Sequence, residues 1–282
     1  MTSEISAPSR PTEVMGTDDQ YRFRMHCLVC PGDMEHFARG EVLGDQPVEY
    51  QRCTRCGLVA AENPTWLDRS YSDAIAATDV GLLGRCLDLG NVASSVIRSE
   101  RLRDGAFLDW AGGYGTLTRL MRDRGLDFRH HDPMATNIFA RGFEGSLEGT
   151  HYDLVTAIEV LEHLTDPRTE LQPVADSTDL LLATTQLMPE PTPRPGEWEY
   201  YATETGQHIT FYTEKSIQEL ATSLGFTSVV SGSLVHLFHR GQVSSRTAAL
   251  VRTPKLAYMA GLGTGLVDRR RSLTLSDAKN SS

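Results

Sequence analysis

Short apolar runs alternate with stretches of helical periodicity over residues 105–240. Each apolar run is about as long as one buried strand, and the stretches between them carry apolar residues three and four positions apart. Strands that alternate with helices pair in parallel through right-handed crossovers. The pattern therefore predicts an α/β core with a mostly parallel sheet. Its expected strands are residues 106–110, 126–132, 152–158 and 179–185.

Two apolar runs at the end of this core, 226–231 and 234–239, are separated only by Gly232 and Ser233. So short a connection favours a hairpin, and these runs predict an antiparallel closing pair of strands. Before them, residues 187–212 form a proline-rich and aromatic stretch that is too long for an ordinary loop. We expect this insertion to cover the substrate.

The pattern of apolar and polar residues also predicts the structure of the segments outside the core. Residues 1–20 are polar and lack apolar periodicity, which predicts a disordered tail. Residues 64–104 predict a helical bridge made of two helices, interrupted near Gly90. The stretch 241–282 predicts one helix followed by a fraying polar end. The remaining segment, 21–63, is defined by its cysteines.

Composition and net charge limit the kinds of partner that the protein is expected to bind. The chain has 282 residues, a formal net charge of -10, 40% hydrophobic residues and a mean hydropathy of -0.30. The negative charge makes nucleic acid an unfavourable partner. The sequence has neither an apolar run long enough to span a membrane nor an apolar secretory leader. We therefore expect a cytoplasmic protein without a membrane partner, in which thiols stay reduced and the isolated Cys86 fills core space.

The other four cysteines form two CxxC pairs, Cys27 with Cys30 and Cys53 with Cys56. Each pair places two thiols on one tight turn, so that two pairs complete a tetrahedron around zinc. Because sulfur would fill all four coordination positions, the expected Zn²⁺ is structural and holds together a small module at 21–63. Buried apolar cysteines without a metal are the alternative.

The first strand of the core ends in an acid and a glycine-rich turn, and Asp132 ends the second strand. A turn this tight lets the backbone approach a cofactor beside a helix N-terminus. An acid after the second strand is placed to bind ribose hydroxyls. A nicotinamide dinucleotide fits these features as well, so an oxidoreductase is one alternative. The residues of the strand end and turn are Asp109, Ala111, Gly112, Gly113 and Gly115.

A more specific sequence follows at residues 152–167, where Tyr-Asp-Leu-Val leads into Glu159-Val-Leu-Glu-His163. With the glycine-rich turn, it resembles the motifs of the class I methyltransferases that use S-adenosylmethionine (SAM). The resemblance covers about 105–240 and implies a Rossmann-like sheet, in which the strand near Phe143 is abbreviated. The residues implied to hold SAM are Asp109, Ala111, Gly112, Gly113, Gly115, Asp132 and Glu159.

A zinc module joined to such a core is similar to the sugar C-methyltransferases of antibiotic deoxysugar pathways and to related glycan and natural-product enzymes. Their active-site segment carries a Glu-His pair, which is matched here by Gln207-His208. The resemblance implies that His208 is the general base, that His163 is a second active-site histidine and that Tyr71 reaches the substrate.

The chain departs from that pattern at several points. Gln207 replaces the family's Glu, Thr205 stands near the place of a common Tyr, and Ala111 replaces the first glycine of the turn. Only a short segment follows Arg240, where the sugar enzymes carry a large C-terminal domain. These differences bear on the acceptor and on C-methylation, and they leave the methyltransferase fold unaffected.

The expected function is methyl transfer to a small-molecule acceptor, preferably a sugar or nucleotide-sugar, in secondary-metabolite or glycan biosynthesis. The alternatives are an O-methyltransferase of a non-sugar natural product and a zinc-ribbon binding protein whose methyltransferase-like domain is inert. The alternative for the same residues is a purely structural role, in which they brace loops, cap helices and pack the insertion. Glu162 is expected to be structural. The candidate catalytic residues are His208, His163 and Glu159, and the candidate substrate contacts are Tyr71, Tyr200, Tyr201 and Gln207.

Overall fold

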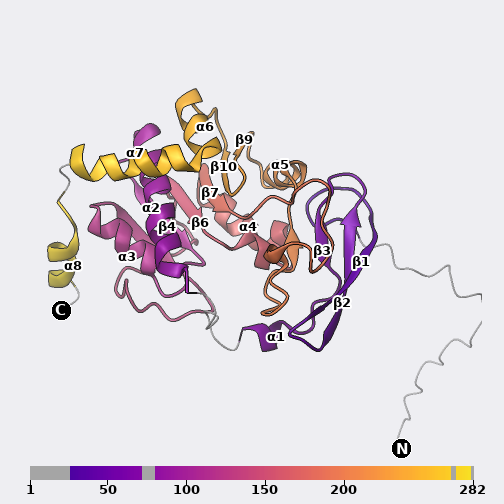
Figure 1. The fold of residues 1–282 in the computed structure, drawn as a ribbon. Helices are drawn as coiled ribbons and strands as arrows, with labels where there is room; N and C mark the ends of the chain where they lie inside the picture. Colours follow the sequence, from indigo (N-terminus) through magenta and orange to yellow (C-terminus); the bar gives the residue numbers. More distant parts are fainter. Residues whose placement is uncertain (1–25, 72–79, 268–270, 281–282) are drawn as a thin grey trace, which may run out of the picture.

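The computed structural model describes residues 26–71, 80–267 and 271–280, so the tail expected at 1–20 lies outside the described residues. Two sheets organise the described chain, and helices flank the larger one (Figure 1). The elements are β1 (Met34–Val42), β2 (Gln46–Cys53), β3 (Val59–Ala61), α1 (Leu67–Ser70), α2 (Leu82–Ser99), β4 (Ala106–Trp110), α3 (Thr116–Asp123), β5 (Asp127–His131), β6 (Leu154–Ala157), η1 (Leu161–His163), α4 (Pro167–Asp176), β7 (Leu180–Thr184), η2 (Glu199–Tyr201), β8 (Thr210–Phe211), α5 (Glu214–Ser223), β9 (Ser228–Ser231), β10 (Val235–His239), α6 (Ser245–Arg252), α7 (Pro254–Val267) and α8 (Thr274–Asn280).

The larger sheet has the strand order β5-β4-β6-β7-β10-β9. The strands β5, β4, β6 and β7 run parallel, whereas β10 is antiparallel to both β7 and β9. Every residue of β6 and β7 is buried, as expected for strands covered on both faces. The prediction of a mostly parallel α/β sheet with an antiparallel closing strand is thus confirmed. The abbreviated strand near Phe143 is present only as a bridge between Glu144 and His130.

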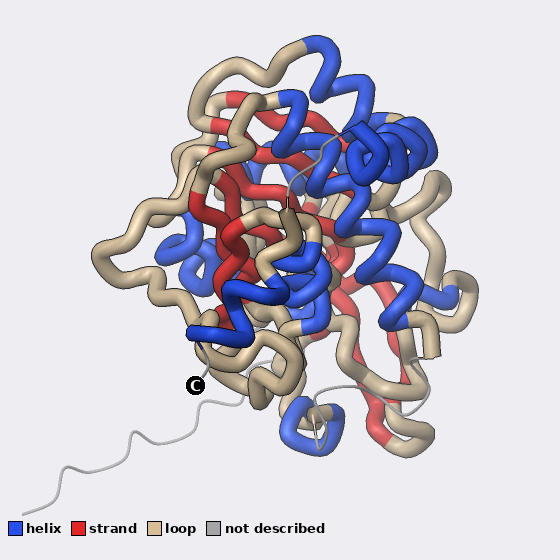
Figure 2. Tube along the Cα trace, turned by 90° about the vertical axis from the view of Figure 1, so that its left-hand side faces the viewer, coloured by secondary structure: helices blue, strands red, loops and turns tan. Residues whose placement is uncertain are grey.

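Neighbouring residues on each strand point to opposite faces, so the large sheet separates two cores. One core packs Phe107 and Leu182 against α2, α3, α6 and α7. The other packs Leu108 and Leu181 against α4 and α5, and it also includes the four cysteines of the CxxC pairs. Figure 2 shows the helices on both sides of the strands. The N-terminal module therefore packs on the α4 and α5 side of the sheet.

The expected interruption of the helical bridge is wrong, because α2 runs without a break through Gly90 and Asn91. A Cβ atom at Gly90 would lie 2.3 Å from Nη1 of Arg124, so the helix needs a glycine where this guanidinium crosses it. The same guanidinium donates a hydrogen bond to Oδ1 of Asn91 at 3.1 Å. Tertiary contacts thus keep two weak helix formers inside a helix.

The expected fraying of the C-terminal end is also wrong for the described residues. Instead of one helix, α6, α7 and α8 follow the core, and Asp277 of α8 is 4% exposed. Its carboxylate accepts hydrogen bonds from Nε and Nη2 of Arg122 at 2.9 and 2.8 Å. This bidentate, buried ion pair docks α8 onto α3. None of the helices in the described part of the chain is long and apolar enough to cross a membrane.

The smaller sheet joins the N-terminal module to the insertion at 187–212. Its strand order is β1-β2-β3-β8, and β8 belongs to the insertion. A third core fills the space beside it, where Tyr50 packs against Tyr201 and Phe211 with ring centroids 5.4 and 6.2 Å apart. The insertion at 187–212 was expected to cover the substrate. Its second half instead forms part of the sheet of the N-terminal module.

Candidate active site

The carboxyl ends of β4, β5 and β6 meet at one edge of the sheet, where β4 leads through the glycine-rich turn into α3. Ala111, Gly113 and Gly115 have φ values of 54°, 56° and 82°. Left-handed backbone is strained for alanine, and such strain is typical of binding sites. A Cβ atom at Gly113 would meet open space, and Gly115 caps α3 without a side-chain hydrogen bond. The first amide groups of α3 thus face an open cradle beside the turn.

Asp109 lies beneath this turn and does not face the cradle. Its side chain is 1% exposed, and its carboxylate accepts hydrogen bonds from the hydroxyls of Thr118 and Thr156 at 3.1 and 2.9 Å. A Cβ atom at Gly112 would lie 2.6 Å from Oδ2 of Asp109, so only glycine leaves room above the carboxylate. The expected direct contact of Asp109 with SAM is corrected to a supporting role, because burial removes the carboxylate from any bound molecule.

Burial raises the pKa of Asp109 to about 6, against the opposing hydrogen bonds of the two threonines. A carboxyl pKa that is raised on folding favours the folded state at low pH, and this contribution is lost as the pH rises through the folded value. We expect it to remove up to about 3 kcal/mol of unfolding free energy between about pH 4 and pH 7. The Asp109→Asn variant cannot ionise and should lack this slope in denaturant unfolding; equal slopes in the two proteins would contradict the prediction.

Asp132 follows β5 and ties the turn to the neighbouring strand. Its Oδ2 accepts a hydrogen bond from the Gly113 amide at 2.8 Å, and its Oδ1 accepts from the amides of Met134 and Ala135, both at 2.8 Å. The side chain is half-buried at the edge of the cradle. Because each carboxylate oxygen can accept two hydrogen bonds, Oδ2 keeps a free position for a ribose hydroxyl.

A second group of polar side chains comes from η1, from the end of α1 and from the insertion. The structure brings together Tyr71, His163 and His208, with the two imidazole centroids 4.9 Å apart and the Tyr71 hydroxyl 2.9 Å from Nδ1 of His163. Beneath them, the Tyr200 hydroxyl donates a 2.6 Å hydrogen bond to Oε1 of Glu162. Residues that are far apart in sequence thus form one cluster.

The hydrogen bonds determine which nitrogen of His208 carries its proton. Nδ1 of His208 lies 2.6 Å from the carbonyl oxygen of Tyr200, and Nδ1 of His163 lies 3.0 Å from that of Gln207. A carbonyl oxygen only accepts, so Nδ1 of His208 carries the proton of its hydrogen bond, whereas Nδ1 of His163 is shared between the Gln207 carbonyl and the Tyr71 hydroxyl. Burial lowers the pKa of His163 to about 3, which keeps it neutral. Because Nδ1 of His208 donates to the Tyr200 carbonyl, Nε2 is the nitrogen of this ring that is left to act on another group.

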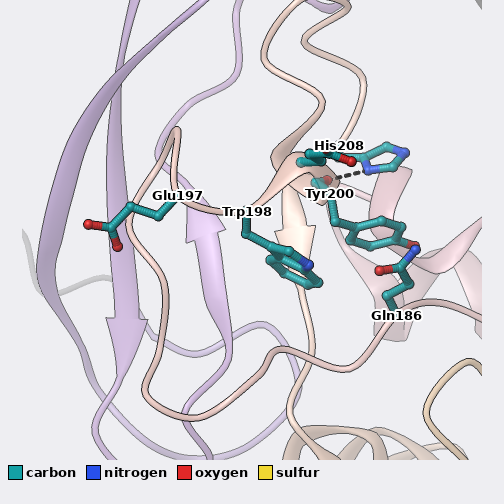
Figure 3. Close-up of a pocket in the computed structure, with 6 residues that line it drawn as sticks. Gln186, Glu197, Trp198, Tyr200 and His208 are labelled. Atoms are coloured by element: carbon teal, nitrogen blue, oxygen red, sulfur yellow. Dashed lines mark hydrogen bonds between the residues drawn. The ribbon is translucent and has the colours of Figure 1, made fainter.

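The cluster borders a pocket of about 440 Å³ that is lined by His208, Tyr200, Trp198, Gln186, Glu197 and Glu199. In Figure 3 the rings of Trp198, Tyr200 and His208 and the Gln186 amide gather on one side, while Glu197 lies farther along the insertion. The Tyr200 and His208 ring centroids are 4.5 Å apart. The wall therefore offers aromatic faces together with carboxylates.

Two expected substrate contacts do not face this pocket. Tyr201 is 0% exposed, and its hydroxyl donates to the Pro193 carbonyl at 2.9 Å, so it packs the smaller sheet. The Gln207 side chain donates to the Ser70 carbonyl at 2.8 Å and braces the end of α1. Both residues serve the fold of the insertion, and the structure corrects their expected role.

Glu159 comes just after β6 and lies between the glycine-rich turn and the histidine cluster. Its φ of 55° is strained, and its Oε1 accepts a hydrogen bond from the Thr184 hydroxyl at 3.2 Å. Burial, together with the charge of nearby Glu162, raises the pKa of Glu159, whereas Arg85, 3.7 Å away, opposes this shift. Glu159 thus lies within electrostatic reach of Glu162 and His208 of the cluster.

Three residues near the site were not expected there from the sequence: Glu162, which bonds to Tyr200, and Gln186 and Glu197, which line the pocket. Glu162 is 0% exposed, yet it contributes to the cluster through Tyr200. Its adjacency to His163 was the available signal. Nothing in the local sequence marks Gln186 or Glu197, because the fold of the insertion brings them to the pocket.

The four cysteines of the CxxC pairs lie close together in the N-terminal module. The Sγ atoms of Cys27 and Cys56 are 3.6 Å apart, and those of Cys30 and Cys53 are 3.5 Å apart. Four sulfurs at about 2.3 Å from a central zinc ion would be about 3.8 Å from one another, so the cluster fits the ion closely. A Cβ atom at Gly32 would lie 2.9 Å from Sγ of Cys53, and the knuckle therefore needs its glycine.

Comparisons with known proteins agree with this architecture. A family model described as a methyltransferase domain matches residues 85–231, slightly more than half of the chain. No curated protein sequence matches the chain.

Solved structures with a similar fold include a methyltransferase of calicheamicin biosynthesis in its S-adenosylhomocysteine-bound form, at 16% identity and a TM-score of 0.37 over 53% of this chain and 54% of that one. Human N-acetylserotonin methyltransferase in complex with SAM has 15% identity and a TM-score of 0.42 over 63% and 66%. Magnesium protoporphyrin IX methyltransferase from Synechocystis has 15% identity and a TM-score of 0.37 over 61% and 90%. The chain thus spans about half to two thirds of the length of the first two proteins.

Proposed function

Because the chain belongs to the methyltransferase domain family whose model matches residues 85–231, we propose that it transfers a methyl group from SAM to a small-molecule acceptor, preferably a sugar or nucleotide-sugar. The observation that carries this proposal is the orientation of His208. Its Nδ1 is held by the Tyr200 carbonyl, which leaves the Nε2 lone pair beside the pocket. A fixed lone pair at this place is what removal of a proton from an acceptor requires.

The edge of the larger sheet fits SAM. The backbone of Ala111 and Gly113, the first amides of α3 and the free lone pair of Asp132 are the groups that would hold it. SAM supplies a methyl group that is electrophilic because it is bonded to a sulfonium. The protein's own tasks are therefore to align the acceptor with that carbon and to accept the acceptor's proton.

His208 is the proposed proton acceptor, and its neighbours position it. The Tyr200 carbonyl fixes one side of the imidazole, and the His163 ring packs against it at 4.9 Å. The ring cannot turn without losing the 2.6 Å hydrogen bond, so the orientation of the imidazole at the edge of the pocket is fixed. Glu159, at the end of β6, joins this base to the SAM edge and is proposed to orient the acceptor.

The lining of the pocket supports a sugar as the acceptor. Aromatic faces such as that of Trp198 pack against the apolar face of a sugar ring, and the Glu197 and Glu199 carboxylates accept hydrogen bonds from hydroxyl groups. Gln207 and Thr205 depart from the sugar C-methyltransferase pattern, so an O-methylated hydroxyl is as consistent with this lining as a C-methylated carbon. The cysteine cluster is proposed to hold a structural Zn²⁺.

The test combines binding with turnover. Calorimetry with S-adenosylhomocysteine is expected to show saturable binding to the full chain. Sugars, nucleotide-sugars and hydroxylated aromatic metabolites are then screened for methyl transfer from labelled SAM. Transfer to sugars would support the proposal, transfer only to the aromatic compounds would favour a non-sugar acceptor, and no binding of S-adenosylhomocysteine would favour an inert domain.

A further inference from the structure

We propose that Glu162, His163 and His208 form a second metal site, which binds one divalent first-row metal ion at the base of the pocket. One ligand atom from each of these residues lies within 4.8 Å of the other two. Two imidazole nitrogens and one carboxylate oxygen are a recurrent ligand set for ions such as Mn²⁺, Fe²⁺ and Zn²⁺. This site is separate from the four cysteines, which belong to the N-terminal module.

Backbone carbonyls hold the two histidines. Metal-ligating histidines almost always donate the proton of the second ring nitrogen to a carbonyl or carboxylate, which fixes the tautomer. His208 does so through Nδ1 to the backbone carbonyl of Tyr200, and Nδ1 of His163 lies 3.0 Å from the carbonyl of Gln207. Both rings are thus held by backbone carbonyls in the way that is typical of metal-binding histidines.

Glu162 is the independent observation that points to a cation. The residue is 0% exposed, and although Tyr200 donates to Oε1, Oε2 has no hydrogen-bond partner among the described residues. A buried carboxylate is costly unless it is paired or bound to a metal. An ion at Oε2 would provide such a partner.

Such an ion also deepens the proposed function, and this part of the inference rests on that function. Three protein ligands leave coordination positions open on the ion. A hydroxyl of the acceptor that binds there loses its proton more easily, because the ion stabilises the resulting alkoxide. The proton passes to water in the pocket, the alkoxide oxygen forms the new bond to the methyl carbon, and the carbon–sulfur bond breaks with its electron pair going to sulfur. In the metal-bound protein His208 is a ligand that holds the ion, and water replaces it as the group that takes the acceptor's proton.

The test is a titration of the zinc-loaded full chain with Mn²⁺, followed by calorimetry and by the loss of the free-ion electron paramagnetic resonance signal. Mn²⁺ is a suitable probe because thiolates select zinc over it, so the cysteine cluster keeps its own ion. We expect one saturable site per chain. Glu162→Gln and His208→Ala should each weaken its affinity by more than about 100-fold.

A matched control is His36→Ala, which removes an exposed histidine bonded to Glu49 at 2.9 Å and should leave Mn²⁺ binding unchanged. Binding of S-adenosylhomocysteine verifies that each variant is folded, and if Glu162→Gln fails that check, His208→Ala decides. Absence of a saturable site, or equal affinity in His208→Ala, would overturn the inference. Because no acceptor is present, this outcome is independent of whether the protein methylates sugars. A transfer rate that does not respond to Mn²⁺ would overturn only the role of the ion in the reaction.

Discussion

His208→Ala is expected to lower kcat by about 10²- to 10⁴-fold, the range typical of losing a positioned acid or base. The variant removes the Nε2 lone pair that the Tyr200 carbonyl holds beside the pocket. His208 has no described hydrogen bond to the glycine-rich turn, so the affinity for S-adenosylhomocysteine should stay within about twofold of that of the native protein, well below the tenfold change that corresponds to 1.4 kcal/mol. Single-turnover methyl transfer and calorimetry measure the two effects separately.

The appropriate control for this variant is His151→Ala, which removes a surface histidine with a 60% exposed side chain. It should keep both kcat and cofactor affinity. If His208→Ala retains full activity, His208 neither takes the proton nor holds an ion that the reaction needs. A loss of cofactor binding in parallel with activity would instead show that His208 supports the fold of the edge.

Cys27→Ser is expected to abolish zinc binding and to destabilise the N-terminal module. Structural zinc contributes about 10–16 kcal/mol of binding free energy in small modules, and that energy stabilises their fold. The variant should contain about one zinc ion per chain less than the native protein, because only the site of the cysteine cluster is lost. Elemental analysis after gel filtration and thermal unfolding provide the two measurements.

Cys86→Ala is the matched control for the cysteine variant. Cys86 is also buried, at 9% exposure, but it belongs to the core on the opposite face of the larger sheet. It should keep the zinc and lose only the packing of one sulfur, roughly 1–2 kcal/mol or less. Native protein without zinc, or equal zinc contents in Cys27→Ser and native protein, would contradict the assignment of the cysteine cluster.

The sequence predicts the larger sheet well because buried parallel strands leave a strong local signal. Leu180–Thr184 is an uninterrupted apolar and threonine run, and the structure buries all five residues. The predicted helix break at Gly90 and Asn91 is wrong. Both residues have low helix propensity, but the Arg124 side chain packs against Gly90 and bonds to Asn91, and these contacts stabilise the helix. Arg124 is distant in sequence, and local periodicity carries no information about it.

The same limit applies to the site. The resemblance to known methyltransferases brought His163, His208 and Tyr71 into one hypothesis, and the structure places them together. The aromatic residues of the insertion suggested Tyr201 as a further substrate contact, although its side chain packs against Tyr50 in the smaller sheet. Adjacent tyrosines in η2 point in different directions, and only the tertiary fold determines which of them reaches the pocket.

The pairing of β3 with β8 has a consequence for the order of folding. It aligns Val59 with Phe211 and Ala60 with Thr210, so the fourth strand of the smaller sheet comes from a distant part of the chain. During synthesis, which proceeds from the N-terminus, both cysteine pairs emerge long before this strand. Contacts between residues far apart in sequence slow folding. The chain loses conformational entropy when the large loop closes, before the contact contributes any stabilising free energy. A metal ion captured early would hold β1, β2 and β3 in place as a template until the segment that carries His208 arrives.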